Sequence, residues 1–261
     1  MIGIIQGRLT NFKNKKILQK FPKNYKSEFE TASKLGFDFI EIFVERKFNY
    51  NNPFWSEKGI NQYNKLIKKF NLKFISITDD RPINLSILTK KYLTYFRKLV
   101  RLSKKLKIEK INIPLYEKSK INKKNLKAMS YSLSAMAKEC KNYNIKMLIE
   151  SNISFEIYKK IKKHKNIFFL YDTGNRSVLK TDPEKDIIMF GKNIKHIHIK
   201  DKSSNGENVL LGMGVVNFNK IFKGLKKISY KEDYVFETTR GKDAMCTAKS
   251  NISFLNRIMQ K

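Results

Sequence analysis

The sequence has few cysteines, prolines and glycines, and it lacks any long apolar run. Its two cysteines, Cys140 and Cys246, lie far apart, so they indicate neither a disulfide framework nor a cysteine metal motif. No Pro-, Gly- or Ser-rich linker divides the 261 residues, which we therefore expect to form one domain, residues 1–261. The apolar stretches are too short for a membrane span, and the N-terminus lacks a basic leader. We expect a cytoplasmic protein without a membrane partner.

Acidic residues and arginines are scarce in comparison with lysines. The chain has 55 Lys and Arg residues against 23 Asp and Glu residues, a formal charge of +32, but only eight of the basic residues are Arg. Nucleic-acid recognition normally depends on Arg side chains, and the lysines here are spread over every predicted helix. The lysine excess therefore indicates an A+T-rich coding background rather than a groove that binds nucleic acid. The same charge could attract phosphorylated substrates.

Strand-like and helix-like segments alternate along the whole chain, which is typical of a parallel sheet with helical crossovers. Eight units can be counted. Their strands are predicted at residues 2–6, 37–43, 73–77, 110–113, 145–149, 167–171, 194–197 and 234–236. No Gly-x-Gly-x-x-Gly turn follows the first strand, which argues against a dinucleotide-binding fold. We predict the α/β class and, within it, a single-domain (β/α)8 TIM barrel.

Four of these strands lead into a residue that can bind a divalent metal. These residues are Glu150, Asp172, His198 and Glu237. In a (β/α)8 barrel, side chains at the carboxyl ends of the strands face a common mouth. Three carboxylates and one imidazole suit one divalent cation, Mn²⁺, Mg²⁺ or Co²⁺, with zinc as an alternative. A lone carboxylate after an apolar run is more often a helix N-cap or a solvated loop residue than a ligand, but the four residues together predict a metal site.

The motifs around these residues resemble those of a known superfamily. Residues 196–201, His-Ile-His-Ile-Lys-Asp, are similar to the His-x-Lys-Asp strand of the xylose-isomerase-like superfamily of sugar phosphate isomerases and epimerases. Residues 171–175 are similar to its Asp-x-Gly-Asn motif, residues 212–218 to its Gly-x-Gly-x-x-Asp/Asn-Phe turn, and residues 39–41 to its second strand. The resemblance covers nearly the whole chain.

This resemblance implies an isomerase that depends on a divalent metal and acts on a sugar or sugar phosphate. As in the ketose 3-epimerases of the superfamily, the four residues named above would bind the cation, and Glu150 and Glu237 would also transfer the proton. The reaction would pass through a metal-stabilised enediolate and would give epimerisation or aldose–ketose isomerisation. The sequence leaves open the sugar, the metal and whether the chain forms a homo-oligomer.

Three further polar residues are candidates for substrate binding. Lys200 could orient the substrate or compensate the charge of the carboxylates, or it could instead form an ion pair with Asp201. Arg240 lies three residues past Glu237, where its guanidinium could hold a hydroxyl, carboxylate or phosphate. Asn175 could contact the substrate, although it could equally cap the helix that follows.

Other residues near the predicted mouth have less specific roles. Arg8, at the end of the first strand, could reach the mouth, whereas His196 and Glu41 are expected to be interior polar groups. The aromatic loop 48–55 is either a lid or a packed surface loop.

Two alternatives belong to other functional classes. Endonuclease IV, a DNA-repair nuclease of the same superfamily, needs histidine ligands for a three-zinc centre. Here the chain has three histidines in all, and the tips of the third and fourth strands, residues 78–81 and 112–115, have none. The other alternative is a barrel that binds a sugar without turnover.

Overall fold

The structure, a computed structural model, describes residues 1–12 and 20–260. Its main sheet is a closed barrel of parallel strands in the order β1-β10-β7-β6-β5-β4-β3-β2, and β8 and β9 form a separate two-stranded sheet. The predicted (β/α)8 barrel fold is therefore confirmed. Contacts within the chain define two compact units, which we call unit 1 (Met1–Phe39 and Leu170–Lys261) and unit 2 (Ile40–Phe169).

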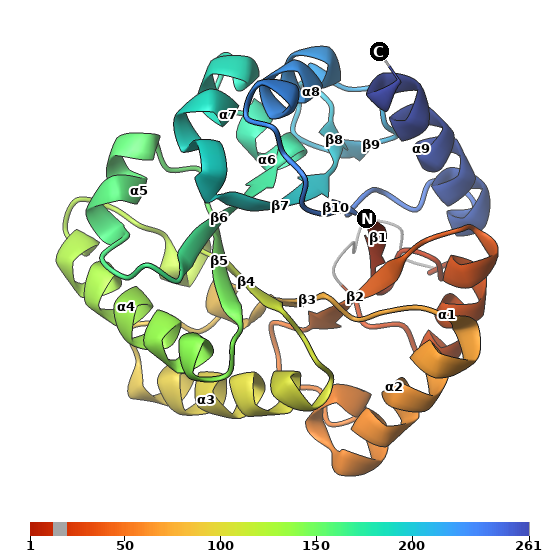
Figure 1. The fold of residues 1–261 in the computed structure, drawn as a ribbon, viewed down its shortest axis with the longest axis horizontal. Helices are drawn as coiled ribbons and strands as arrows, with labels where there is room; N and C mark the ends of the chain where they lie inside the picture. The colour runs from red at the N-terminus through yellow and green to blue at the C-terminus, as the bar shows by residue number, and fades with distance from the viewer. Residues whose placement is uncertain (13–19, 261) are drawn as a thin grey trace. The chain divides into compact units, whose positions relative to one another are not determined.

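The barrel strands of unit 1 are β1 (Ile2–Ile5), β7 (Ile194–Ile199), β10 (Tyr234–Phe236) and the end of β6 (Ile167–Asp172). The separate small sheet consists of β8 (Asp201–Lys202) and β9 (Asn208–Val209). Its helices are α1 (Tyr25–Lys34), α6 (Thr173–Ser177), α7 (Pro183–Phe190), η4 (Gly191–Asn193), α8 (Phe218–Lys227) and α9 (Ala244–Met259). Helices α7 and α8 pack side by side (Figure 1).

The pairing register of β1, β10 and β7 fixes where the carboxyl end of β10 lies. Val235 of β10 lies opposite Gly3 of β1 on one side and opposite His198 of β7 on the other. Val235 is fully buried, and the ring of Phe236 packs edge-on against Phe37 at 5.9 Å between ring centres. Glu237, the next residue, therefore follows directly on a strand end that is packed in the core.

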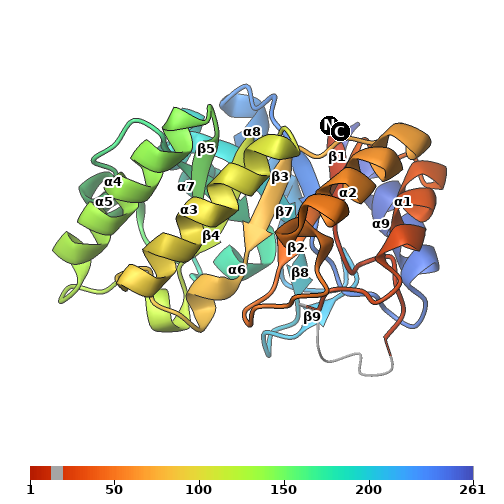
Figure 2. The same ribbon diagram turned by 90° about the horizontal axis from the view of Figure 1, so that it is seen from below.

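Unit 2 contains the strands β2 (Phe39–Val44), β3 (Ser76–Asp79), β4 (Lys110–Pro114) and β5 (Lys146–Glu150), together with the beginning of β6. Its helices are α2 (Glu57–Phe70), α3 (Lys90–Lys105), α4 (Leu126–Asn142) and α5 (Phe155–Ile161), with short helices η1 (Pro53–Trp55), η2 (Arg81–Ile83) and η3 (Glu117–Ser119). Helices α3 and α4 lie side by side in both views (Figures 1 and 2).

Local chemistry explains where several helices begin. Helix α2 starts where the Ser56 hydroxyl accepts the N–H of Gly59, and α3 where the Thr89 hydroxyl accepts the N–H of Tyr92. The Asp182 carboxylate accepts two N–H groups at the start of α7, and Pro183 occupies the first helical position. Among the described residues, no helix is both long and apolar enough to cross a membrane.

Three details of the fold differ from the sequence predictions. Strand β3 begins at Ser76 rather than at residue 73, although the carbonyl of Lys73 already accepts the N–H of Ile40 in β2 and that of Ile75 the N–H of Lys110 in β4. Helix α6 was not predicted, since Thr-Gly-Asn-Arg-Ser has low helix propensity. His198 lies inside β7, which continues to Ile199.

Candidate functional site

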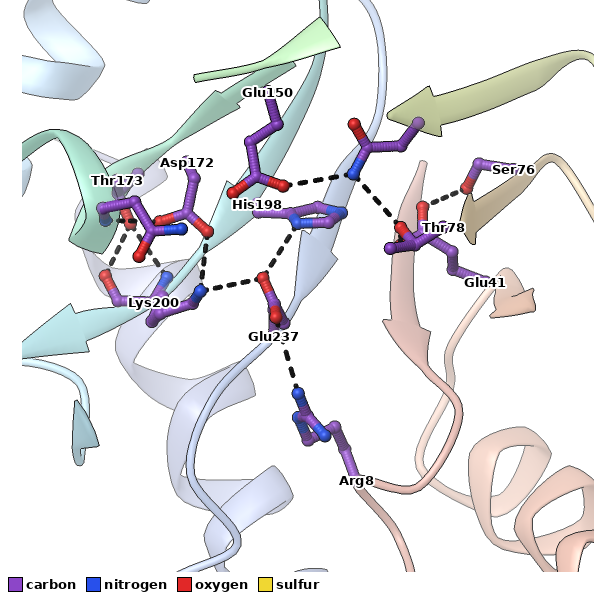
Figure 3. Close-up of polar contacts among 12 residues, drawn as sticks. Arg8, Glu41, Ser76, Thr78, Glu150, Asp172, Thr173, His198, Lys200 and Glu237 are labelled. Carbon is purple, nitrogen blue, oxygen red and sulfur yellow. Dashed lines mark hydrogen bonds and ion pairs between the residues drawn. The ribbon is translucent and has the colours of Figure 1, made fainter. Parts of the chain in front are cut away.

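Four side chains of unit 1 gather at the carboxyl ends of β6, β7 and β10 (Figure 3). The Nζ atom of Lys200 lies 2.8 Å from Oδ2 of Asp172 and 2.9 Å from Oε2 of Glu237. Nδ1 of His198 lies 3.0 Å from the same Glu237 oxygen. All four residues are buried, with exposed fractions of 5% or less. Three of the predicted metal ligands and one predicted substrate-binding residue are therefore in mutual contact.

The turn after β6 holds Lys200 in place. The Thr173 hydroxyl donates to the carbonyl of Lys200 at 2.6 Å and accepts its N–H at 2.8 Å. At Gly174, an added Cβ would lie 3.0 Å from Cγ of Lys200, so a side chain there would crowd the lysine stem. The Thr-Gly pair after Asp172 thus fixes the lysine backbone and leaves room for its side chain.

The charges around Glu237 stabilise its ionised form. Burial alone would raise the pKa of Glu237, but Lys200, His198 and Arg8 outweigh burial and hold that pKa well below its usual value. Arg8 contributes through Nη2, which lies 3.6 Å from Oε1 of Glu237. Burial raises the pKa of Asp172, and Lys200 acts in the opposite direction. Glu237 is therefore a carboxylate at neutral pH.

This set of donors fits a divalent cation. Asp172 and Glu237 already share one cationic group, the ammonium of Lys200. When Nδ1–H of His198 donates to Glu237, Nε2 carries the lone pair that can bind a metal. Asp172 and His198 belong to a buried group of side chains that could hold a metal ion, and Glu237 adds a carboxylate beside His198.

Glu150, the fourth predicted ligand, is the last residue of β5 in unit 2 and is 5% exposed. Its carboxylate accepts the side-chain N–H of Asn112 and the hydroxyl of Tyr116, both at 3.2 Å. Asn112 also donates to the hydroxyl of Thr78, which in turn donates to Glu41 (Figure 3). A chain of hydrogen bonds thus connects β2, β3, β4 and β5 and orients Glu150.

Arg240 is buried and bonded to the chain itself. Its Nε donates to the carbonyl of Gly7, and its guanidinium lies 4.5 Å from the ring centre of Phe12. Burial lowers the pKa of Arg240 to about 9, an effect that Arg8 reinforces and Glu28 opposes. The structure thus gives Arg240 a role in holding the segment after β1, and its contact with substrate stays a prediction.

Two of the open alternatives are wrong. Asn175 does not cap the following helices, because Asp172 caps α6 and Asp182 caps α7. Asn175 instead donates its backbone N–H to Asp172 at 2.6 Å. Lys200 does not pair with Asp201, whose carboxylate accepts backbone N–H groups of the loop at residues 212–216.

Sequence reasoning missed several residues that position the site, among them Tyr116 and Glu28. Tyr116, beyond β4, contacts Glu150, and the only sequence signal was an aromatic residue just after a strand tip. Glu28 of α1 accepts the N–H groups of Gly7 and Leu9 at 2.7 and 3.0 Å and the hydroxyl of Thr10 at 2.8 Å. In the sequence, Glu28 looks like any acidic residue in the first turn of a helix, so no neighbouring residue indicated its role.

Comparisons with solved structures agree with this fold. D-psicose 3-epimerase from Clostridium cellulolyticum H10, solved with D-tagatose, aligns with a TM-score of 0.78 at 17% identity over 99% of both chains. L-ribulose 3-epimerase aligns with a TM-score of 0.79 at 17% identity, over 99% of this chain and 94% of that one. The IolI protein, solved with a zinc atom, aligns with a TM-score of 0.78 at 16% identity, over 99% and 98%.

At these identities the structural likeness shows the fold alone. No curated protein matches the sequence. A family model described as xylose isomerase-like TIM barrel matches residues 29–258, which is most of the chain. The chain therefore belongs to the xylose isomerase-like TIM barrel family.

Proposed function

We propose that the protein is a divalent-metal-dependent sugar or sugar phosphate isomerase or epimerase that works by proton transfer. The observation that carries this proposal is the buried cluster in unit 1, where the ammonium of Lys200 bridges Asp172 and Glu237 beside His198. Several solved structures with the same fold are sugar epimerases, and one was solved with D-tagatose and another with D-fructose.

In this proposal Asp172, His198 and Glu237 bind one cation, Mn²⁺, Mg²⁺, Co²⁺ or Zn²⁺. Glu150 is proposed as the fourth ligand because it ends β5, the neighbour of β6 in the strand order. The cation would polarise the sugar carbonyl and a neighbouring hydroxyl, and so acidify the C–H bond between them.

The two glutamates are proposed to move the proton. Glu237 is ionised because of Lys200, His198 and Arg8, so it can accept a proton from carbon. Glu150 is oriented by Asn112 and Tyr116 and is proposed to exchange the second proton. Return of a proton to the same carbon from the opposite face gives an epimer. If the enediolate spans C1 and C2 of a ketose, protonation of C2 instead gives an aldose.

Lys200, Arg240 and Asn175 are proposed to bind substrate oxygens. Lys200 neutralises Asp172 and Glu237 in this structure. Once a metal ion supplies that positive charge, the ammonium can move to a hydroxyl or phosphate oxygen.

The direct test combines metal analysis with two substitutions. Glu150→Gln and Glu237→Gln should each bind metal more weakly and lose turnover of ketoses or ketose phosphates. Glu232→Gln is the matched control, since Glu232 is a partly buried carboxylate of unit 1 that pairs with Lys195. Full turnover in both glutamate variants would contradict the proposal.

The same preparations address the two other functional classes. Incision of abasic-site DNA by the metal-loaded protein would instead support a nuclease. Sugar binding without turnover would support a binding protein.

A further inference from the structure

A basic pocket lies in unit 2, beyond the carboxyl ends of β2 and β3. It has a volume of about 340 Å³. Its lining includes four cationic side chains together with an aromatic ring and an amide: Arg46, Lys47, Arg81, Lys91, Phe48 and Asn84. No carboxylate belongs to the lining. The pocket holds two of the eight arginines of the chain, so lysine-rich composition alone does not account for it.

Only part of this positive charge is neutralised by neighbouring acids. Arg46 pairs with Asp80 at 2.7 Å and with Glu117 at 3.6 Å. Lys47 and Lys91 are exposed, and neither pairs with an acid within the described parts of the chain. Asp79 also interacts electrostatically with Arg81. Four cations thus face three neighbouring carboxylates, and the net positive charge that remains favours an anion.

Arg81 is held in place by aromatic rings. Its guanidinium lies 4.8 Å from the ring centre of Tyr95 and 6.0 Å from that of Phe48. Phe48 itself packs against Trp55, with 4.8 Å between ring centres. The loop that carries Phe48 is thus packed against the protein, and it positions a cation at the pocket.

One nitrogen of Arg81 lacks a protein acceptor. Its Nε is buried and makes no hydrogen bond to any described residue. A buried N–H donor without an acceptor is costly, and such groups are uncommon in folded proteins. An oxyanion bound by Arg81 would supply the acceptor, and a guanidinium binds phosphate or carboxylate oxygens in a forked geometry.

The pocket lies at the same edge of the unit 2 sheet as Glu150. Strands β2, β3, β4 and β5 are parallel neighbours, and both the pocket and Glu150 lie at their carboxyl ends. The hydrogen bonds from Glu41 through Thr78 and Asn112 to Glu150 cross the same four strands. An anion in the pocket would therefore be on the face that presents the proposed proton-transfer residue.

We propose that this pocket binds the phosphate group of a phosphorylated sugar and that the substrate is a sugar phosphate. This inference rests on the proposed isomerase or epimerase function. A phosphate monoester is a dianion near neutral pH and matches the partly compensated charge of four cations. The carboxylate of a sugar acid shares the oxyanion chemistry, but it carries a single charge.

The test compares a series of ketose phosphates with the corresponding free ketoses and with ketose-derived sugar acids. Arg81→Gln should weaken binding of ketose phosphates by about ten- to one-hundred-fold. Arg81→Lys, which keeps the positive charge but loses the forked guanidinium, should weaken binding of ketose phosphates less. Lys91→Met should also weaken it, and binding of free ketoses should change in none of these variants.

Arg97→Gln and Lys104→Met are matched controls, because both residues are exposed and lie on α3, the helix that carries Lys91. They should bind ketose phosphates like the wild-type protein. Equal binding of ketose phosphates by wild type and by both Arg81 variants would overturn the inference. A preference for sugar acids that depends on Arg81 would overturn the assignment to phosphate.

A separate arm distinguishes this inference from the proposed function. Glu237→Gln should still bind ketose phosphates through the pocket although it turns none over. The wild-type, metal-loaded protein could bind ketose phosphates in a manner that depends on Arg81 and yet turn none over. That result would support the phosphate pocket and contradict the proposed function. If wild type and Arg81→Gln alike turn over free ketoses as well as their phosphates, the proposed function stands and the inference about the pocket is overturned.

Discussion

Nζ of Lys200 lies 2.9 Å from Oε2 of Glu237, in a cluster where both side chains are almost fully buried. The same nitrogen is 2.8 Å from Asp172. Two carboxylates that would otherwise repel each other in a low-dielectric interior are thus bridged, and their charge is partly neutralised, by one ammonium. A divalent cation bound by these carboxylates would take over the role of Lys200 and release it.

Replacing Lys200 with Met should therefore destabilise the metal-free protein. The loss should be about 3–5 kcal/mol, because two buried carboxylates would be left without their cation. Adding Mn²⁺ should restore much of the unfolding free energy, which chemical denaturation with and without a chelator measures. Lys195→Met is the control: Lys195 pairs with Glu232 in a partly exposed site and should cost less than about 1 kcal/mol. Equal losses, or no recovery with metal, would contradict this account.

The carboxylate of Asp201 holds the loop that carries the glycine-rich turn. It accepts the N–H groups of Gly212, Gly214 and Val216 at 2.9 to 3.2 Å. Asp201→Asn would place an amide N–H₂ against these donors in either orientation, so we expect a loss of about 3 kcal/mol. Hydrogen exchange should show faster opening at residues 212–216. Unchanged protection there would mean that the loop is held by other contacts.

Asp79 should make stability depend on pH. It is fully buried, accepts the hydroxyls of Tyr92 and Tyr95 at 2.8 Å, and burial raises its pKa to about 6. A raised pKa in the folded state favours the protonated form. The contribution of Asp79 to stability is therefore greatest below its usual pKa and is lost as the pH rises through about 6.

Asp79→Asn mimics the protonated form, and tyrosine hydroxyls can donate to it or accept from it. Relative to this variant, the wild-type protein should lose about 3 kcal/mol of unfolding free energy between pH 4 and pH 7. Urea denaturation of both proteins across that range measures the difference. A difference that stays constant with pH would show that Asp79 titrates normally.

Glu28 should act on the reaction through the segment after β1. Its carboxylate binds Gly7, Leu9 and Thr10, which flank Arg8, and Arg8 contacts Glu237. In Glu28→Gln we expect kcat to fall about ten- to one-hundred-fold, because a small displacement of a charged group is costly, while metal affinity stays unchanged. Glu30→Gln, on the exposed side of the same helix, is the control. Equal kcat in Glu28→Gln and wild type would exclude a positioning role.

The barrel fold could be predicted from the sequence, whereas the four proposed metal ligands stay a prediction. Each of Glu150, Asp172 and Glu237 ends or directly follows a buried apolar strand, and the family motifs support the choice. The fold itself places such strand ends at one edge of the sheet.

The sequence suggested that Lys200 could compensate carboxylate charge, but not which carboxylates, because Asp172 and Glu237 are far from it in sequence. The alternative partner was its neighbour Asp201, whose side chain instead accepts backbone N–H groups of a later loop. Helix α6 was missed for a related reason: its formation depends on the cap by Asp172 rather than on helix propensity.

Glu150 and Glu237 are proposed to move a proton beside a sugar carbonyl with the help of a divalent cation. Deuterium incorporation from D₂O into ketoses and ketose phosphates measures this step directly. We expect the metal-loaded protein to place deuterium on a carbon next to the carbonyl, and chelation or Glu237→Gln to abolish the exchange. A metal-loaded protein that binds the sugar but incorporates no deuterium would contradict this proposal.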